Sequence, residues 1–202
     1  ARVRALLLIK HQYDALKQQT ENMRWVAVTD SLTGVRSRRY LVDNGEAFLR
    51  KEEHQPVWAL IIDIDHFKNI NDTLGHITGD HVLAALGKTL NEFFPEDMVV
   101  RFGGEEFCVL VANSNADDML PRAEKLRRHI EALQPAGVNT TISIGLAGSE
   151  DHPNQHMSDF LMLADKALYQ AKETGRNRVC IATPEGSQLS PLHETNLEKL
   201  PA

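Results

Sequence analysis

Apolar and polar positions alternate along this chain in blocks that predict a series of strands and helices. Val57–Ile62 is a continuous apolar run, long enough for a buried strand, and Asp63-Ile64-Asp65 follows it directly. Farther along, the runs 99–102 and 108–111 lie on either side of Gly103-Gly104-Glu105-Glu106-Phe107. Two β-rich runs joined through a glycine pair predict a hairpin, in which the glycines allow positive φ and a close approach of a ligand.

The remaining blocks predict further elements around these strands. The helix that begins at Asn115 has carboxylates in its first turn, which suit the positive end of the helix dipole, and Ser158 is the expected cap of the last helix. The order of elements indicates an α/β (α+β) fold with a central, mostly antiparallel sheet and helices packed largely on one face. The expected helices are Arg38–Arg50, Gly79–Phe94, Asn115–Leu133 and Ser158–Gly175, and the expected strands are Val57–Asp65, the hairpin 99–111, Thr140–Ala147 and Asn177–Ala182.

The two ends of the chain differ from this pattern. Residues 1–28 contain no Gly or Pro and repeat apolar or small side chains at alternating spacings of three and four, which is a heptad seam. The seam predicts a weak intermolecular coiled coil, which we favour, or an amphipathic helix packed on its own domain. Residues 183–202 contain three prolines and little periodicity, as in a disordered tail. We therefore expect a helical segment 1–28, a domain 29–183 and a tail 184–202.

Composition narrows the classes of partner. The 202 residues carry a formal net charge of −6, which argues against a nucleic-acid surface and against a patch for anionic membranes. No run reaches the roughly 18 apolar residues of a membrane span, and no signal peptide is visible. The chain starts at Ala1, so we expect a piece of a longer protein. Cys108 and Cys180 lie in apolar runs and are expected to be buried thiols rather than a redox pair, which fits a reducing cytoplasm.

Carboxylates are concentrated at the ends of the predicted strands. Alternation places Asp63 and Asp65 on one face of their strand, and Glu105 and Glu106 lie at the hairpin turn. Crowded carboxylates are costly unless a cation lies between them, and a divalent metal is the expected cation. Taken alone, the hairpin is equally compatible with a solvated turn. A strand that ends in Asp-x-Asp beside a hairpin with two Glu is typical of palm-type polymerases and nucleotide cyclases, which hold two Mg²⁺ ions there.

Six segments of the chain, in their order and spacing, resemble the GGDEF domain of the diguanylate cyclase family. The resemblance covers roughly residues 29–183, and Glu105 stands where the family name has Asp, as in the GGEEF variant. It implies a palm-like nucleotide-cyclase fold with a helix of coiled-coil type before it. The six segments are Asp30–Gly34, Asp63–Asp72, Gly75–Asp80, Arg101–Phe107, Thr141–Gly145 and Ala164–Asn177.

The resemblance also implies roles for individual residues. The expected metal ligands are the side chains of Asp63, Glu105 and Glu106 and the Ile64 carbonyl. The expected catalytic residues are Glu105, as the base for a 3′-hydroxyl, and Lys68, as a cation near the phosphates. The expected substrate ligands are Asn71 and Asp80 for guanine, Leu32 and Leu83 for the base pocket, and Lys172 and Arg176 for the phosphates.

Other interpretations of these residues stay open. Asp80 could be only a helix N-cap, and Lys172 with Arg176 could only complement the negative end of a helix dipole. Asp65 could pair with an arginine in a structural role instead of binding metal. Two further predictions are that Arg38 and Asp165 form a structural salt bridge, and that His66 and His76 bind no metal.

A product-inhibition motif of the family is incomplete. Many members carry Arg-x-x-Asp, with the Asp six residues before the first signature glycine. Counting back from Gly103 gives Asp97, but Phe94 stands at the arginine position. Phe has none of the donors of a guanidinium fork, so we expect a degenerate inhibitory site in which Phe94 packs at the apolar end of its helix. Arg101 belongs to the hairpin and cannot rebuild the pair alone.

The function that the resemblance implies is the condensation of two GTP molecules to cyclic di-GMP and two pyrophosphates. Each subunit is expected to bind one GTP and two Mg²⁺, for which Mn²⁺ can substitute, so that two subunits of a homodimer must face each other. The N-terminal helix would join the dimer and link it to an upstream sensor or membrane domain, with this domain in the cytoplasm and a role in signalling and biofilm formation. The alternative is a degenerate domain that binds GTP or cyclic di-GMP and regulates a partner.

Overall fold

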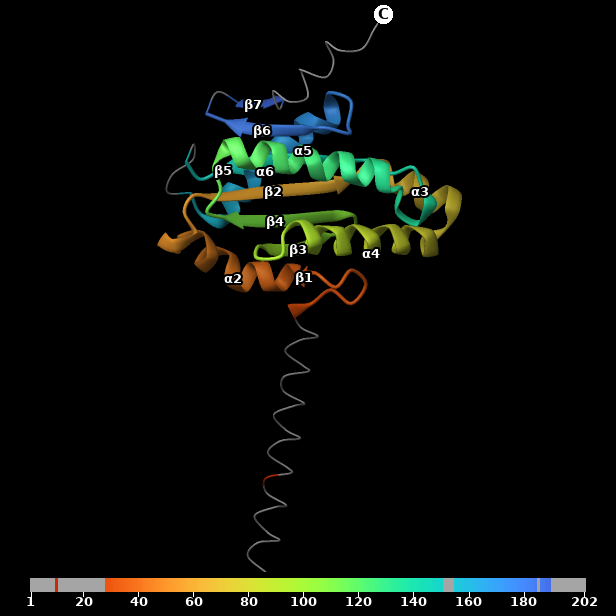
Figure 1. Ribbon diagram of the computed structural model, residues 1–202, viewed down its shortest axis with the longest axis horizontal. Coiled ribbons are helices and arrows are strands. Elements are labelled where there is room, and N and C mark those ends of the chain that lie inside the picture. The colour runs from red at the N-terminus through yellow and green to blue at the C-terminus, as the bar shows by residue number, and fades with distance from the viewer. Residues whose placement is uncertain (1–9, 11–27, 151–154, 185, 190–202) are drawn as a thin grey trace, which may run out of the picture.

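The computed structural model describes residues 10, 28–150, 155–184 and 186–189, which form a sheet covered by helices (Figure 1). The seven strands lie in the order β1-β3-β4-β2-β5-β6-β7. β1 pairs with β3, and β5 with β6, in parallel, whereas the other neighbouring strands are antiparallel. The mostly antiparallel sheet is thus confirmed. The strands are β1 (Arg36–Ser37), β2 (Val57–Ile64), β3 (Met98–Gly103), β4 (Glu106–Ala112), β5 (Ile142–Gly148), β6 (Val179–Thr183) and β7 (Gly186–Leu189).

Helices cover both faces of the sheet, so the expectation of helices largely on one face is wrong. One core cluster joins alternate residues of β2 to α4 and α5, and a second joins the other residues of β2 to α2 and α6. All eight residues of β2 are buried, which requires cover on both sides. The helices are α2 (Arg38–Arg50), α3 (Phe67–Leu74), α4 (His76–Phe93), α5 (Ala116–Leu133) and α6 (Met157–Glu173), with short 3-10 turns η1 (Glu52–His54) and η2 (Pro135–Gly137).

Helix boundaries follow the capping residues in most cases. α2 has the predicted bounds, and α5 follows the predicted cap, because Asn115 Oδ1 accepts a hydrogen bond from Asp118 N at 3.0 Å. The last helix differs, since α6 begins at Met157 after His156, so Ser158 is its second residue and not its cap. Helix α3 was not expected. Helix α4 begins at His76, three residues before the predicted start at Gly79.

The ends of the domain are only partly described. Residues 1–9 and 11–27, where the coiled coil is expected, lie outside the described residues. At the other end, β7 pairs with β6 in the segment expected to be a disordered tail, so that expectation is wrong at Gly186–Leu189. The boundaries at residues 28 and 183 stay predictions.

Two expectations from composition can be compared with the described residues. Cys108 and Cys180 are free, buried thiols, as expected, and burial raises the pKa of Cys108 to about 12 and that of Cys180 to about 11. Among the helices that the structure describes, none has the length and apolar character needed to cross a membrane.

Candidate active site

The site is organised by the pairing of β2 with β4. Asp63 lies directly opposite Glu106 across this antiparallel pair, and opposite Ser143 of β5 on its other side. Directly opposed residues of an antiparallel pair point to the same face of the sheet. The register therefore brings the end of the apolar run at β2 to the first residue after the hairpin turn, as the sequence predicted.

Asp63 is buried at this meeting point and is paired with a lysine. It is 6% exposed, and its Oδ2 lies 2.9 Å from Nζ of Lys172 in the last turn of α6. Burial raises the pKa of Asp63 to about 6; Lys172 opposes the rise, and the charges of Glu105 and Glu106 add to it. Two further carboxylates thus act on Asp63 here, with one lysine as its partial counterion. The contact between Lys172 and Asp63 was not predicted, because Lys172 was assigned to phosphates alone.

The hairpin turn is held by an arginine that sequence reasoning did not place in the site. Arg101 donates from Nε and Nη2 to the Gly104 carbonyl at 3.1 and 2.8 Å, and its Nη1 lies 3.2 Å from Asp30 Oδ1. Asp30 in turn accepts from the backbone N and the hydroxyl of Thr33. Arg101 therefore links the turn that bears Glu105 to the loop 30–34. Its position two residues before Gly103 was the available signal.

The two signature glycines do not adopt backbone angles that only glycine favours, and their small size is the feature that matters here. Neither Gly103 nor Gly104 has positive φ, contrary to expectation. A Cβ at Gly104 would have no neighbour within 4 Å, whereas one at Gly103 would lie 3.2 Å from Glu106 Oε2. The open volume beside Gly104 is consistent with the close approach of a ligand to the turn.

Asp65 has a structural environment within the described residues. Its Oδ1 accepts from Ser143 Oγ at 2.7 Å, and its Oδ2 accepts from Thr141 Oγ1 at 2.7 Å and from Asn177 N at 3.0 Å. These partners satisfy the carboxylate without a metal and without an arginine. The structural interpretation of Asp65 is therefore supported, although its partners are two hydroxyls and a backbone amide.

The expected guanine ligands lie together on α3 and α4. Asn71 of α3 packs against Gly79, where a Cβ would overlap Asn71 Oδ1, and Asp80 follows Gly79 on α4. Asp80 is exposed and lies in the second turn of a helix that begins at His76, so the N-cap interpretation is wrong. The close approach at Gly79 keeps the Asn71 amide against the first turns of α4.

The other expected ligands differ in burial and in their place in the fold. Lys68 is exposed in the first turn of α3. Leu32 is partly buried and Leu83 is 3% exposed, and both pack in the core on the α4 side of the sheet. Arg176, just beyond α6, has positive φ and donates from Nη1 to the Lys172 carbonyl at 3.4 Å. His66 and His76 stand at the starts of α3 and α4.

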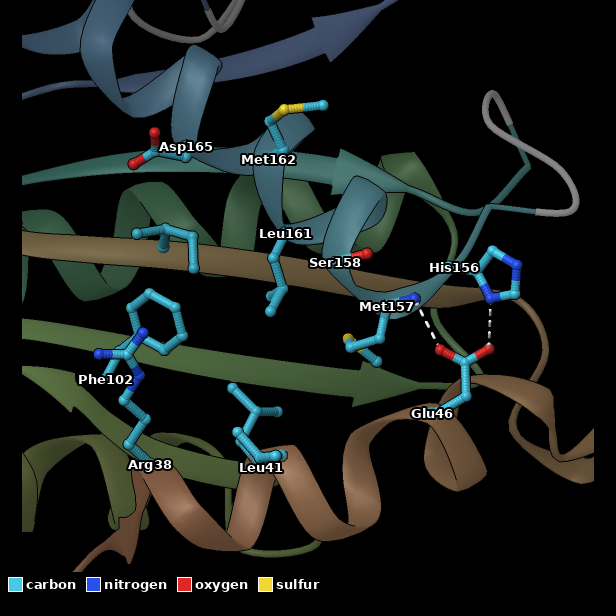
Figure 2. Close-up of a pocket in the computed structure, with 12 residues that line it drawn as sticks. Arg38, Leu41, Glu46, Phe102, His156, Met157, Ser158, Leu161, Met162 and Asp165 are labelled. Carbon is cyan, nitrogen blue, oxygen red and sulfur yellow. Dashed lines mark hydrogen bonds and ion pairs between the residues drawn. The ribbon is translucent and has the colours of Figure 1, made fainter.

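A cavity of about 710 Å³ lies between α2 and α6 (Figure 2). Ile61 of β2 lines it, and alternation along the strand places Asp63 on the same face of the sheet. Arg38 and Asp165 line it from opposite walls. Among the described residues no ion pair joins them, so the expected salt bridge is not formed; instead the Arg38 guanidinium lies 4.9 Å from the centre of the Phe102 ring. Asp63, Glu105 and Glu106 are not part of its lining, so this cavity is separate from the centre at Asp63.

The segment before β3 has the packing that was expected of a degenerate inhibitory motif. Phe94 is 1% exposed in the core at the end of α4. Asp97 pairs with Arg122 of α5, whose Nη2 lies 2.9 Å from Asp97 Oδ2 and whose guanidinium lies 4.2 Å from the centre of the Phe94 ring. Arg122 was not singled out from the sequence, because nothing in the local pattern connects it to residues 94–97.

The donor set at the hairpin fits a divalent cation. Within the described part of the chain, no three His, Cys, Asp or Glu side chains are already gathered around one point for a metal. Mg²⁺ does not need such a cage, because it is usually held by one or two carboxylates, waters and substrate phosphates. Buried Asp63 and the two nearby glutamates match that requirement, and a cation bound at Asp63 would replace the Lys172 ammonium now in contact with it.

This geometry belongs to a nucleotide-cyclase type of domain, and comparison with known proteins identifies the family. The sequence model described as "Diguanylate cyclase, GGDEF domain" matches residues 27–178. The chain therefore belongs to the GGDEF family, and the resemblance seen in its motifs is confirmed.

Individual relatives agree with this assignment. The response regulator PleD of Caulobacter vibrioides is 38% identical over 191 residues, which cover 89% of this chain and 41% of PleD. The chain thus spans about two fifths of the length of this curated relative. The coiled coil and GGDEF domain of DgcB from Caulobacter crescentus, solved with c-di-GMP, is similar with a TM-score of 0.80 at 28% identity, over 88% of this chain and 97% of that one. The active GGEEF domain of a diguanylate cyclase from Vibrio cholerae has a TM-score of 0.65 at 32% identity, over 72% of this chain and 96% of that one.

Proposed function

We propose that this domain is a diguanylate cyclase that condenses two GTP molecules into cyclic di-GMP and two pyrophosphates. The observation that carries the proposal is the register of β2 with β4, which sets buried Asp63 opposite Glu106 and beside the turn that bears Glu105. Domains named as diguanylate cyclases among the solved structures share this fold, including one with the GGEEF signature.

The reaction assigns a distinct task to each group. The 3′-hydroxyl oxygen of one GTP forms a bond to the α-phosphorus of the other, while the bond from that phosphorus to the bridging oxygen breaks and pyrophosphate leaves with the electron pair. Glu105 accepts the hydroxyl proton. Lys68, Lys172 and Arg176 neutralise charge on the triphosphate, and Lys172 does so by moving from Asp63 to the phosphates.

Divalent ions complete this arrangement. Asp63, the Ile64 carbonyl, Glu105 and Glu106 would hold two Mg²⁺, or Mn²⁺ in its place, which polarise phosphate oxygens and make the hydroxyl more acidic. The raised pKa of Asp63 supports metal binding there, since a cation would stabilise the charged form of a carboxylate that is buried and lies near two other carboxylates.

Guanine is the base that the α3–α4 pair suits. The Asp80 carboxylate can accept from the N1–H and the 2-amino group of guanine together, a pattern that adenine lacks. Asn71, held against Gly79, would add an amide to the recognition of the base. Leu32 and Leu83 would supply the apolar walls of the base pocket.

A homodimer is part of the proposal, because one site that holds one GTP needs a second copy opposite it. We propose that residues 1–28 join the two copies and connect them to an upstream sensor or membrane domain of a longer protein. The helix would then raise the effective concentration of the second half-site. A cytoplasmic location, where GTP is available, and a role in cyclic di-GMP signalling belong to this proposal.

Incubation of the purified chain with GTP and Mg²⁺, followed by chromatographic separation of the nucleotides, tests the function. The proposal expects cyclic di-GMP and pyrophosphate with GTP, no product with ATP, and no product when a chelator replaces Mg²⁺. Tight GTP binding without any product would instead identify a degenerate, regulatory GGDEF domain. A different cyclic or linear nucleotide would contradict the proposed reaction.

A further inference from the structure

The turn that carries Arg176 has an uncommon backbone. Gly175, Arg176 and Asn177 have φ values of 125°, 62° and 47°, so three consecutive residues lie in the positive-φ region. For a side chain such as arginine this region is unfavourable, and surrounding contacts must hold it. Local bonds contribute, because Arg176 N donates to the Ala171 carbonyl at 2.9 Å and Arg178 Nε donates to the Arg176 carbonyl at 2.8 Å.

Asn177 ties this turn to the end of β2. Its backbone N–H donates to Asp65 Oδ2 at 3.0 Å, and Asp65 is two residues beyond Asp63. Asp65 is itself fixed by the hydroxyls of Thr141 and Ser143. Other backbone bonds tie the turn to α6 and β5, from Arg176 N to the Ala171 carbonyl and from Ile144 N to the Arg178 carbonyl. The contact with Asp65 is the one that ties it to the end of β2, so its position relative to Asp63 also depends on what holds Asn177.

The Asn177 side chain is held from the opposite layer of the molecule. Its Oδ1 accepts from Arg127 Nη1 at 2.6 Å, and its Nδ2 donates to Glu131 Oε1 at 2.9 Å. The Arg127 side chain is 9% exposed and also pairs with Glu131 at 3.0 Å and with buried Glu124 at 2.9 Å. Arg127 lies on α5, which covers the face of the sheet opposite to α6, so the contact joins the two helical layers.

We infer that Asn177 and Arg127 are positioning residues for triphosphate binding: through the α5 network they fix the left-handed turn that aims Arg176. The inference rests on the proposed function, in which Arg176 binds phosphate. Neither residue needs to touch the nucleotide. A merely structural network would keep α5 on the sheet and would affect binding of all parts of the nucleotide equally, and this difference makes the inference testable.

Binding of two nucleotides to single variants separates these roles. 3′-Deoxy-GTP has the triphosphate but lacks the attacking hydroxyl, so it binds without reacting, whereas GMP lacks the β- and γ-phosphates. Asn177→Gly removes the side chain and keeps a residue suited to positive φ. Arg127→Lys keeps a positive charge beside Glu124 and loses the planar fork that reaches Asn177. We expect both variants to bind 3′-deoxy-GTP about tenfold more weakly in Mg²⁺, as lost charge-assisted hydrogen bonds imply, with GMP affinity unchanged.

Arg128→Gln is the matched control, because it removes an arginine from the same helix. The Arg128 side chain is 54% exposed, and its Nε lies 4.0 Å from Glu124 Oε2, a longer separation than in the Arg127 pair. Arg128 takes no part in the contact between Arg127 and Asn177. Its affinities for both nucleotides should equal those of the parent. Equal weakening of 3′-deoxy-GTP and GMP by Asn177→Gly and Arg127→Lys would overturn the positioning role.

A double-variant cycle with Arg176→Ala completes the test. If Asn177 acts through Arg176, then Asn177→Gly should add almost nothing to the loss caused by Arg176→Ala, whereas additive losses would overturn the inference. If Arg176→Ala alone leaves the affinity for 3′-deoxy-GTP unchanged, the phosphate role in the proposed function is what fails. The cycle therefore tells the two failures apart.

Discussion

Two aspartates of this domain, Asp63 and Asp97, have equally buried side chains and differ in what surrounds them. Each side chain is 8% exposed, and each has one cationic partner at 2.9 Å, Lys172 or Arg122, whose side chain is about one third exposed. Burial raises the pKa of both carboxyl groups, and the partner lowers both. Neither burial nor the ion pair therefore distinguishes a candidate site from a structural contact.

The number of partners on each side makes the difference. Arg122 donates from Nη2 both to Asp97 and, at 2.6 Å, to the Phe93 carbonyl, and its guanidinium lies against the Phe94 ring, so three contacts hold it. Lys172 is a point charge that faces Asp63 with further negative charge nearby from Glu105 and Glu106. A centre with excess negative charge and a single lysine counterion can accept a metal and phosphates, whereas an arginine held by several contacts stabilises the fold.

The largest effect should come from the carboxylates at the hairpin. We expect Asp63→Ala and Glu105→Ala each to reduce cyclic di-GMP formation by at least about a hundredfold, because each removes a group that offsets charge in the transition state. The rate of product formation is measured by chromatography, and circular dichroism checks that the fold survives. Asp97→Ala is the matched control from the other cluster and should retain activity.

If Asp63→Ala and Glu105→Ala both kept activity within about tenfold of the parent, the metal assignment would fail. If Asp97→Ala were as inactive as Asp63→Ala while still folded, the distinction between the two clusters would be wrong. The three variants together thus test the comparison and not only the importance of one residue.

The second effect concerns the second copy of the chain, which the proposed reaction at Asp63 needs and the ion pair of Asp97 with Arg122 does not. Deletion of residues 1–28 should leave a folded domain that is mostly monomeric and whose specific activity falls on dilution. For a weak dimer, the specific activity should drop about in proportion to protein concentration. Enzyme assays over a dilution series, with sedimentation to report the oligomeric state, make the measurement. Equal specific activity at all concentrations, with and without the helix, would contradict this prediction.

Local patterns were sufficient to predict much of the fold. The bounds of α2, the cap of α5 and the hairpin follow from capping residues, periodicity and a glycine pair, which act over short distances. Cover on both faces was missed, although the fully apolar run of β2 was a signal for it. Helix α3 and strand β7 are only eight and four residues long and have no strong period of their own, so tertiary packing decides them.

The meeting of Asp63 with the glutamates of the hairpin was predictable, because one strand end and one turn carry these residues. The contacts between distant segments were not predictable. Lys172 meets Asp63, Arg122 meets Asp97 and Arg127 meets Asn177 only because the sheet and helices bring them together. Each of these cations had an ordinary local explanation as a charged helix residue.

A smaller effect should appear in stability as a function of pH and Mg²⁺. The pKa of Asp63 is raised from 3.8 to about 6 in the folded state, so the folded chain keeps a proton that the unfolded chain releases between these values. The free energy of unfolding therefore falls as the pH rises through this window, and the loss is complete above about pH 6. Asp63→Asn removes this loss and should raise the melting temperature at pH 7.5 without divalent ions by about 3–6 °C.

Two comparisons sharpen this prediction. At pH 4 the difference between Asp63→Asn and the parent should disappear, because Asp63 is then protonated in the folded parent. Mg²⁺ should raise the melting temperature of the parent and of Asp97→Asn, and leave that of Asp63→Asn unchanged. A lower melting temperature for Asp63→Asn at pH 7.5, or an equal Mg²⁺ response in all three proteins, would contradict the assigned environment.

The smallest effect is expected from cyclic di-GMP at the Asp97 cluster. Phe94 replaces the arginine of the family's inhibitory motif, and it is buried rather than available to a ligand. Arg122 lies close by, but its guanidinium already contacts Asp97, the Phe93 carbonyl and the Phe94 ring, and a ligand would have to break these contacts before gaining its own. Calorimetric titration of the chain with cyclic di-GMP should therefore show little high-affinity binding at this surface.

Phe94→Arg, which restores the motif, is not a clean gain-of-function variant, because it places a charge in the core. Asp97→Ala is the informative change: a sub-micromolar site in the parent that disappears in this variant would show that the Arg122 clamp opens for a ligand, and the contrast with the centre at Asp63 would then lose its basis.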